Sequence, residues 1–210
     1  MQHDRTHEDN TVAEQPDQQA IHQAIRNRYT AVAGSAVGKF AYPTGRAGAI
    51  ELDYDADALD AIPSPSLAAF CGVGNPWILG APRAGETVLD IGCGAGVDLV
   101  IAAQGVGSTG RVWGIDMTPA MARRAQRTLT QMGISHGHVA LAQAEALPCA
   151  TGRIDVVTSN GMLNLSPQKA ISFREIWRVL KPGGRLQFAD MTLREALPAE
   201  LTASLDAWSD

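Results

Sequence analysis

Residues 88–98 read VLDIGCGAGVD, and this stretch decides the fold class of the chain. A short apolar run ends at Ile91, and three glycines follow at alternate positions, Gly92, Gly94 and Gly96. Glycines between a strand and a helix let backbone N–H groups approach a ligand with no Cβ in the way. The stretch predicts either a ligand-binding loop or a tight turn that binds nothing, so the neighbouring sequence has to decide.

The regions around this loop repeat an alternation of strand and helix. Apolar, β-branched runs separated by helical stretches are typical of parallel strands joined by crossover helices. The sequence therefore predicts an α/β fold with a parallel sheet and helices on both faces. The expected strands are residues 87–91, 111–115, 138–142, 154–159 and 185–190.

Two helices that follow the loop have clear start signals. Thr118 and Pro119 give one of them an N-cap and a proline at its first position. Ser166 and Pro167 do the same for the helix after the fourth strand, and the glycine pair at 183–184 is expected to end it. The face of this second helix expected against the sheet consists of Phe173, Ile176, Trp177 and Leu180.

The remaining sequence is less regular. A helix is expected at 22–33, another short one at 56–61 and a last one within 194–208. The rest of 34–65 is either a mobile lid or a plain irregular connection. We divide the chain into a polar, disordered tail, an N-terminal cap and an α/β domain, at residues 1–20, 21–85 and 86–210.

The composition argues against several function classes. Seventeen basic and 22 acidic side chains give a net charge of −5 without a long basic run, so neither a nucleic-acid nor a membrane partner is expected. Cys71, Cys93 and Cys149 are widely spaced, which predicts no disulfide framework and no metal site. Residues 1–20 lack the apolar core of a signal peptide, and no apolar run reaches membrane-spanning length. We expect a cytoplasmic protein.

The acidic residues near the loop indicate the kind of ligand. Asp116 ends the second expected strand at the spacing, roughly 20 residues, at which a carboxylate accepts ribose hydroxyls of a nucleoside. The loop reads G-x-G-x-G, not the G-x-G-x-x-G of dinucleotide-binding proteins, and Asp90 precedes it. An acid there disfavours a nearby pyrophosphate. The pattern predicts an adenosine-containing cofactor that carries a positive charge and an ammonium group.

Five motifs in order, VLDIGCGAGVD, GIDMTPAM, AEALP, IDVVTSN and VLKPGGRL, resemble those of class I S-adenosylmethionine-dependent methyltransferases. The resemblance covers about residues 86–190. More closely, GNP at 74–76, GIDMTP and SNGMLNLSPQKA resemble the arsenite methyltransferases, with the quinone-biosynthesis C-methyltransferases more distant. The resemblance implies a Rossmann-like fold, S-adenosyl-L-methionine as cofactor and a small-molecule methyl acceptor.

The resemblance also implies roles for individual residues. Asp90 would help to hold the ammonium group of the cofactor, Asp116 the ribose hydroxyls, and Met117 one face of the adenine. The adenine amino group usually meets an acid where this chain has Gln143, whose amide oxygen can accept instead. Asn160 would lie beside the methionine end, near the sulfonium. The full expected cofactor-binding set is Tyr29, Asp90, Gly92, Cys93, Gly94, Gly96, Asp116, Met117, Gln143, Ala144 and Asn160.

The methyl acceptor and the catalytic residues stay open. The segment SNGMLNLS at 159–166 supplies no general base, which favours an acceptor with its own lone pair, such as trivalent arsenic, a thiolate, a selenide or a stabilised carbanion. The arsenite enzymes hold arsenic with cysteines, and at two of the positions this chain has Val73 and Gly161. Segment 34–42, where further cysteines would be expected, has none. The loss removes the soft ligands that favour arsenic.

The number of strands leaves alternatives. The resembled fold has seven strands, the last two forming a hairpin, and five are expected here, so we expect the C-terminal strands to be missing. An open sheet edge is usually covered or paired in natural proteins. The chain is therefore a shortened one, an enzyme completed by a homo- or hetero-oligomeric partner, or a non-catalytic subunit that binds the cofactor.

Overall fold

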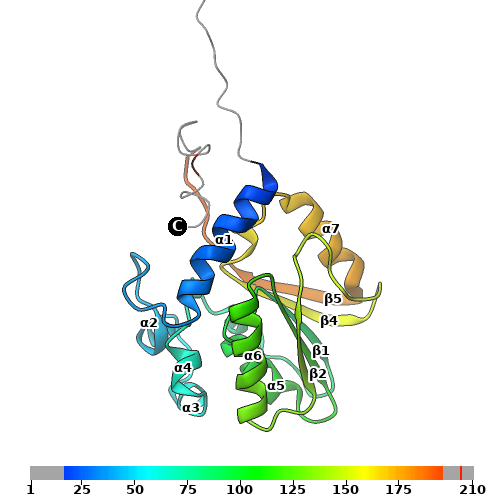
Figure 1. The fold of residues 1–210 in the computed structure, drawn as a ribbon. Helices are drawn as coiled ribbons and strands as arrows, with labels where there is room; N and C mark the ends of the chain where they lie inside the picture. Colours follow the sequence, from blue (N-terminus) through cyan, green and yellow to red (C-terminus); the bar gives the residue numbers. More distant parts are fainter. Residues whose placement is uncertain (1–16, 196–203, 205–210) are drawn as a thin grey trace, which may run out of the picture.

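A computed structural model describes residues 17–195 and residue 204. Its centre is a five-stranded sheet in the order β3-β2-β1-β4-β5, in which every neighbouring pair is parallel (Figure 1). The strands are β1 (Thr87–Ile91), β2 (Arg111–Asp116), β3 (Gly137–Leu141), β4 (Ile154–Asn160) and β5 (Leu180–Ala189). All five expected strands are present, and the predicted α/β, Rossmann-like fold class is confirmed.

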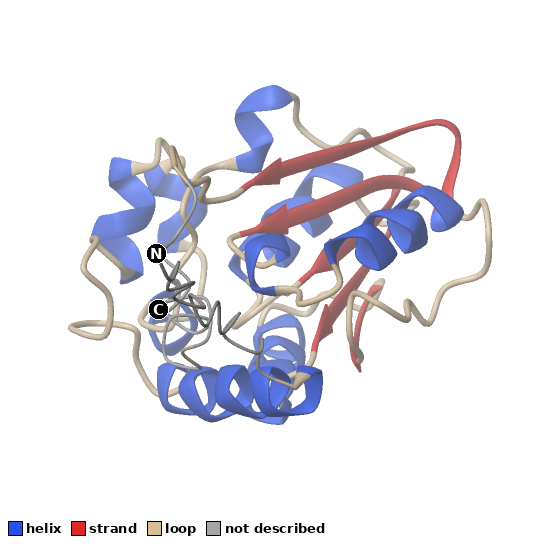
Figure 2. Ribbon diagram, turned by 90° about the horizontal axis from the view of Figure 1, so that it is seen from above, coloured by secondary structure: helices blue, strands red, loops and turns tan. Residues whose placement is uncertain are grey.

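Helices cover both faces of the sheet (Figure 2). The α-helices are α1 (Gln18–Val32), α2 (Gly45–Glu51), α3 (Ala56–Asp60), α4 (Ser64–Leu67), α5 (Val97–Val106), α6 (Pro119–Gln131) and α7 (Lys169–Val179). Two short 3-10 helices are η1 (Pro76–Leu79) and η2 (Leu163–Leu165).

The alternation of side chains along the strands builds two core layers. Val88, Val112 and Val156 are register neighbours on one face and pack with the residues of α5. Leu89 and Val157 point to the other face, into the cluster that contains the buried side of α7. Since successive side chains of a strand point to opposite faces, the apolar run of β1 serves both layers.

The N-terminal elements pack into the same core as the sheet. Tyr54, Leu59 and Trp77 belong to the hydrophobic cluster that contains Val88 and α5, and α1 packs on α6 (Figure 1). Segment 34–65 holds α2 and the start of α4 besides the expected short helix, so it contains more helix than expected. Helix α1 begins at Gln18, which places residues 18–20 in a helix and not in the expected tail.

The helix α7 differs from its prediction in face and length. Its buried side chains are Ser172, Ile176 and Val179, whereas Trp177 is 83% exposed and Phe173 is 40% exposed. The helix ends at Val179 and β5 follows at once, so the glycine pair at 183–184 lies inside a strand. Ser172 is accommodated on the buried face because its hydroxyl hydrogen-bonds with that of Ser166, 2.9 Å away.

Strand β5 forms one edge of the sheet, and β3 forms the other. Within residues 17–195 β5 pairs with β4 alone. The helix expected at 194–208 lies almost wholly outside the described residues, as do residues 1–16 of the expected tail. No helix in the described part of the chain is long and apolar enough to cross a membrane.

Candidate functional site

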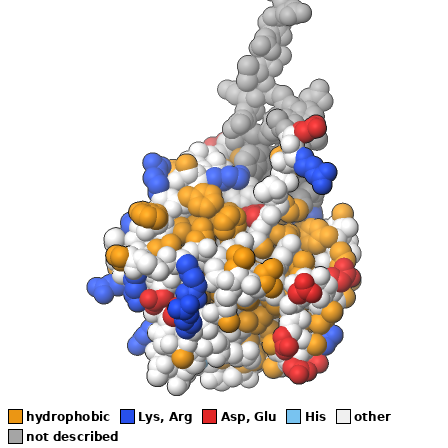
Figure 3. Space-filling view, turned by 180° about the vertical axis from the view of Figure 1, so that it is seen from behind, with side chains coloured by type: hydrophobic (Ala, Val, Ile, Leu, Met, Phe, Trp, Pro, Cys, Tyr) orange, Lys and Arg blue, Asp and Glu red, His pale blue; other side chains and the backbone are white. Residues whose placement is uncertain are grey.

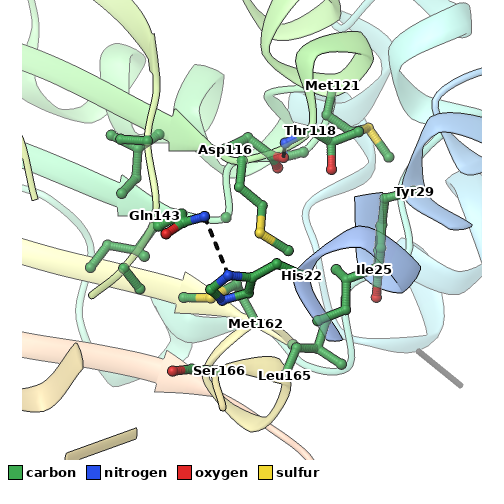
Figure 4. Close-up of a pocket in the computed structure, with 18 of the residues that line it drawn as sticks. His22, Ile25, Tyr29, Asp116, Thr118, Met121, Gln143, Met162, Leu165 and Ser166 are labelled. Atoms are coloured by element: carbon green, nitrogen blue, oxygen red, sulfur yellow. Dashed lines mark hydrogen bonds between the residues drawn. The ribbon is translucent and has the colours of Figure 1, made fainter. Parts of the chain in front are cut away.

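A cavity opens at the carboxyl ends of β1, β2 and β4, where ligands bind in open α/β sheets. Its empty volume is about 730 Å³, part of which is open to solvent. Its walls come from the glycine loop, the ends of β2 and β4, the segment after β3 and helix α1 (Figure 4). Segments far apart in the sequence therefore meet at one cavity.

The glycine loop forms one wall of this cavity. Gly92 and Gly94 have φ angles of 75° and 52°, in the region that favours glycine. A Cβ at Gly92 would lie 2.6 Å from the side chain of Met162, whereas a Cβ at Gly94 would enter open space. Gly94 therefore leaves open space beside the loop, and Gly92 allows the loop to pass Met162.

Asp116 joins the loop to the end of β2. Its Oδ2 accepts the backbone N–H of Gly94 at 3.0 Å, and its Oδ1 accepts that of Thr118 at 2.7 Å. Each carboxylate oxygen retains lone-pair capacity for a further donor. Removal from water raises the pKa of Asp116 to about 6, although both backbone hydrogen bonds lower it. The carboxylate is held in place and can accept hydroxyl groups from a ligand.

A chain of polar side chains lines the cavity beyond Asp116. Gln143 donates its Nε2 to Nδ1 of His22 at 3.3 Å (Figure 4). Nε2 of His22 lies 3.8 Å from Oε1 of Glu145, and Ser166 donates its hydroxyl to the same oxygen at 2.5 Å. These groups come from α1, from the segment after β3 and from the segment before α7, so the contacts hold α1 over the cavity.

Helix α1 supplies a further wall. His22, Ile25 and Tyr29 all line the cavity, at the i, i+3 and i+7 positions of one helix face. Cys71 lines it beside them. Burial raises the pKa of the Cys71 thiol to about 12. The pKa of Tyr29 is also raised above its ordinary value, mainly by burial and to a smaller extent by the nearby Cys71. Both groups stay protonated at neutral pH.

Asn160 borders the cavity, but its amide is turned into a buried network. Its Oδ1 accepts the backbone N–H groups of Val73 and Gly74, at 2.8 and 3.2 Å. Its Nδ2 lies within hydrogen-bonding distance of Tyr54 Oη at 3.0 Å, the Gly74 carbonyl at 2.8 Å and Asp98 Oδ2 at 3.2 Å. Asn160 thus fastens segment 73–74 to the end of β4.

Two carboxyl groups lie buried under the glycine loop. Asp98 accepts hydrogen bonds from Tyr54 Oη at 2.7 Å and Trp77 Nε1 at 2.9 Å, besides Asn160. Asp90 is 2% exposed, and its Oδ2 has no hydrogen-bond partner among the described residues. Burial, and then the neighbouring Asp98, raises the pKa of Asp90 well above its ordinary value. Burial also raises the pKa of Asp98.

The structure brings eight of the eleven expected cofactor-binding residues to the cavity wall. They are Tyr29, Gly92, Gly94, Asp116, Met117, Gln143, Ala144 and Asn160. Three do not line it. Asp90 lies beneath the loop, Cys93 is buried with its Sγ facing Gly114 of β2, and Gly96 caps α5 where a Cβ would press on Ala125. Whether the eight bind a cofactor stays a prediction.

Sequence reasoning missed the other cavity residues. His22 and Ile25 share a helical stripe with Tyr29, so the periodicity of α1 could have found them. Glu145 and Ser166 carried no comparable signal, because their meeting with His22 depends on tertiary packing. The network partners Tyr54 and Asp98 were missed for the same reason.

The two positions at which the resemblance implies lost cysteines are in contact. A Cβ built at Gly161 would lie 3.4 Å from Cγ1 and 3.5 Å from Cγ2 of Val73. Cys71 lies two residues before Val73 and reaches the cavity. In the part of the chain that the structure describes, no cluster of three or more histidine, cysteine or acidic side chains could hold a metal ion.

Comparison with known proteins gives a family match over most of the α/β region. A family model described as a methyltransferase domain matches residues 82–209. An arsenite methyltransferase of Halobacterium salinarum is 32% identical over 216 aligned residues, which cover 96% of this chain and 55% of that protein. An arsenite methyltransferase of Aquipseudomonas alcaligenes is 38% identical over 138 residues, which cover 62% of this chain and 39% of that protein.

A solved structure is similar as well. The arsenic(III) S-adenosylmethionine methyltransferase CrArsM of Chlamydomonas reinhardtii superimposes with a TM-score of 0.57 at 32% identity, covering 76% of this chain and 53% of that one. The chain therefore spans about half the length of these relatives, or less.

Proposed function

Because the chain belongs to the methyltransferase-domain family, we propose that it transfers a methyl group from S-adenosyl-L-methionine to a small acceptor that brings its own lone pair. The resemblance drawn from the sequence motifs is confirmed by this family membership. The observation that carries the proposal is the single cavity in which the glycine loop, Asp116 and Gln143 meet.

The residues of the cavity fit the cofactor along its length. Gly94 leaves open space at the loop, and Asp116 has lone pairs free for two ribose hydroxyls. Met117 and Ala144 offer apolar surface for an adenine ring, and the Gln143 amide can accept from its amino group. Asp90 lies too deep to line the cavity, so its carboxyl would act on the ammonium group through the loop or through water.

Two titratable side chains of the cavity wall favour an acceptor that needs no base. The chemistry that the cofactor supplies when bound is an electrophilic methyl group on a sulfonium, which an in-line nucleophile accepts. Tyr29 and Cys71 line the cavity, and the raised pKa of each keeps it protonated. Neither can take a proton from an alcohol or amine at neutral pH. These two residues shape the pocket and exclude water.

The acceptor pocket lacks the thiolates that would favour arsenic. Val73 and Gly161 are in contact where the resemblance implies two cysteines, and Cys71 is the one thiol nearby that lines the cavity. The names of the relatives make arsenite a candidate, whereas the side chains favour a less thiophilic acceptor such as a selenide, a small thiolate or a stabilised carbanion.

A second candidate function is a cofactor-binding subunit that a partner chain completes. The observation that favours it is the edge of the sheet. Strand β5 pairs on one side only within residues 17–195, Phe188 on it is 42% exposed, and Trp177 of α7 is 83% exposed. Figure 3 shows hydrophobic side chains over much of one face of the molecule. An unpaired edge beside exposed aromatic rings is suited to a partner.

One pair of measurements tests both functions. Calorimetry with S-adenosylmethionine should show binding to the purified chain, and labelled methyl transfer should occur to at least one of arsenite, selenite, small thiols and quinone precursors. Asp116→Ala is the matched control, which should weaken binding and lower the rate of transfer. Binding without turnover, with activity that returns on addition of a partner chain, would favour the second function, and no binding would exclude both.

A further inference from the structure

We propose that His22 is a specificity-determining residue, which orients the amide of Gln143 so that the amide oxygen faces the amino group of the cofactor's adenine. The inference rests on the proposed function, because it takes Gln143 to lie at the adenine. It concerns a residue on α1, outside the motifs of the α/β region. His22 acts on the cofactor through Gln143, so it is a positioning residue.

The contacts around His22 form a continuous chain. The His22 side chain is 14% exposed and that of Glu145 is 12% exposed, so both lie mostly out of water. Nδ1 of His22 is 3.3 Å from Nε2 of Gln143, and Nε2 of His22 is 3.8 Å from the carboxylate of Glu145. Ser166 donates to that carboxylate at 2.5 Å. Figure 4 shows His22 directed from α1 toward Gln143.

The carboxylate decides which nitrogen of His22 carries the proton. A neutral imidazole has one N–H donor and one acceptor nitrogen, and the neighbouring groups choose between them. Nε2 is the ring nitrogen that faces the Glu145 carboxylate, 3.8 Å away, so electrostatic attraction favours the proton on Nε2 and leaves Nδ1 as an acceptor. An acceptor at Nδ1 requires a donor from Gln143, which is its amide nitrogen.

The orientation of the amide then follows. With its Nε2 donating to His22, Gln143 turns its Oε1 away from His22, and that oxygen accepts no hydrogen bond within residues 17–195. A carboxylate at this position would need no such control because both of its oxygens accept. An amide presents a donor and an acceptor, so its recognition of an amino group depends on which way it is turned.

Helix α1 gives His22 a fixed position for this role. Ile25, one turn further along the same face, is 3% exposed and lines the cavity. At the start of α1, Oε1 of Gln18 accepts from Nε2 of Gln168 at 2.5 Å. The helix is thus docked on both sides of His22, and the histidine reaches Gln143 without a long flexible arm.

The test compares two ligands that differ at one position of the purine. S-adenosylhomocysteine has a 6-amino donor, whereas its hypoxanthine analogue has a 6-carbonyl acceptor. Calorimetry on the full chain gives the ratio of the two dissociation constants, first for the wild type and then for His22→Ala and His22→Phe. The phenylalanine variant keeps a ring of similar size but cannot accept a hydrogen bond, so it gives the same comparison if the alanine variant weakens α1.

The wild type should bind the amino ligand more tightly than the carbonyl ligand. In both His22 variants the ratio of the two dissociation constants should fall by roughly 3- to 10-fold, which corresponds to the loss of one neutral hydrogen bond. Ile25→Ala is the control. This variant loosens the docking of α1, so it should weaken the binding of both ligands while leaving the ratio of their dissociation constants unchanged. In a Gln143→Glu background the His22 variants should no longer change the ratio, since a carboxylate has no donor side to turn.

Two results would overturn the inference. An unchanged ratio in both His22 variants would mean that the histidine does not set the amide, and an equal change in Ile25→Ala would mean that α1 acts only as a wall. Failure of the wild type to bind S-adenosylhomocysteine would instead remove the proposed function, so the two failures can be told apart.

Discussion

Asp116 accepts the backbone N–H of Gly94 through Oδ2 at a distance of 3.0 Å. The contact ties the end of β2 to the middle of the glycine loop, and Gly92 and Cys93 add to it by donating their N–H groups to the carbonyl of Ile115. The acid and the loop therefore form one preorganised unit. A change at Asp116 should affect ligand binding and loop order together.

Asp116→Ala should weaken binding of S-adenosylhomocysteine by about 1.5–3 kcal/mol, because a charged acceptor of hydrogen bonds is lost. It should also lower the melting temperature, since the N–H groups of Gly94 and Thr118 lose their partner. Calorimetry and thermal unfolding measure the two effects. Asp155→Ala is the control. It removes a carboxylate whose partners, Lys181 and Thr87, lie outside the cavity wall, and this variant should bind the ligand with unchanged affinity. Unchanged affinity in Asp116→Ala would mean that the ribose lies elsewhere.

The raised pKa of Asp116 predicts a pH dependence of binding. The carboxyl group titrates at about 6 in the free protein, compared with an ordinary value of 3.8. Ribose hydroxyls donate to the ionised form, so affinity should rise with pH through 6 and level off above it, with about a tenfold loss per pH unit well below 6. Titration calorimetry between pH 5 and 8 tests this, and Asp116→Asn should flatten the profile.

The sequence predicted the strands of this fold better than its helix faces. In β1 and β4, short and nearly continuous runs of apolar and β-branched side chains gave nearly the observed bounds. In α7, two faces of the helix could have packed against the sheet, and the more hydrophobic face contains Trp177, which is exposed. The face that packs includes Ser172, whose burial depends on its hydrogen bond to Ser166. Hydrophobicity alone could not predict this hydrogen bond, which allows the Ser172 hydroxyl to be buried.

The site was predictable where a local motif forms it. The glycine loop and Asp116 lie on consecutive strands, so their meeting follows from the parallel sheet. His22 meets Gln143 across 121 positions of sequence, and Asn160 meets Tyr54 across 106. Such pairs depend on how α1 and the segment before β1 pack, which no local pattern in one sequence encodes.

Asp90→Asn should stabilise the protein at neutral pH, because the amide keeps the shape of the carboxyl group but not the ionisation that burial opposes. The pKa of Asp90 is raised in the folded state, so its ionisation opposes folding increasingly as pH rises above its ordinary value of 3.8. The gain should therefore vanish at acid pH. Thermal unfolding at several pH values measures it. Asp98→Asn, which turns a donor toward Asn160, should destabilise instead.

A double variant tests what the contact between Val73 and Gly161 implies for the acceptor. Val73→Cys with Gly161→Cys would place two thiols side by side, because a Cβ at 161 lies 3.4 Å from the Val73 side chain. The double variant should retain trivalent arsenic after desalting under reducing conditions, as mass spectrometry can detect. Each single variant should retain far less, since one thiolate cannot chelate. Gly161 has a φ of 71°, so Gly161→Cys alone should cost about 1–2 kcal/mol of stability.

Asn160→Ala should destabilise the fold by more than about 2 kcal/mol, because the N–H groups of Val73 and Gly74 and the carboxyl group of Asp98 all lose a buried partner. Asn160→Asp keeps the acceptor for both N–H groups but sets a second carboxyl group against Asp98.

The aspartate variant should therefore be destabilised at neutral pH and recover as acid neutralises the pair, whereas the alanine variant should not recover. Thermal unfolding of both variants from pH 4 to 8 separates these outcomes, with Asn27→Asp on the exposed side of α1 as the control. Equal pH profiles for the two variants would show that Asn160 is not coupled to Asp98, and the amide would then be free to serve the cofactor.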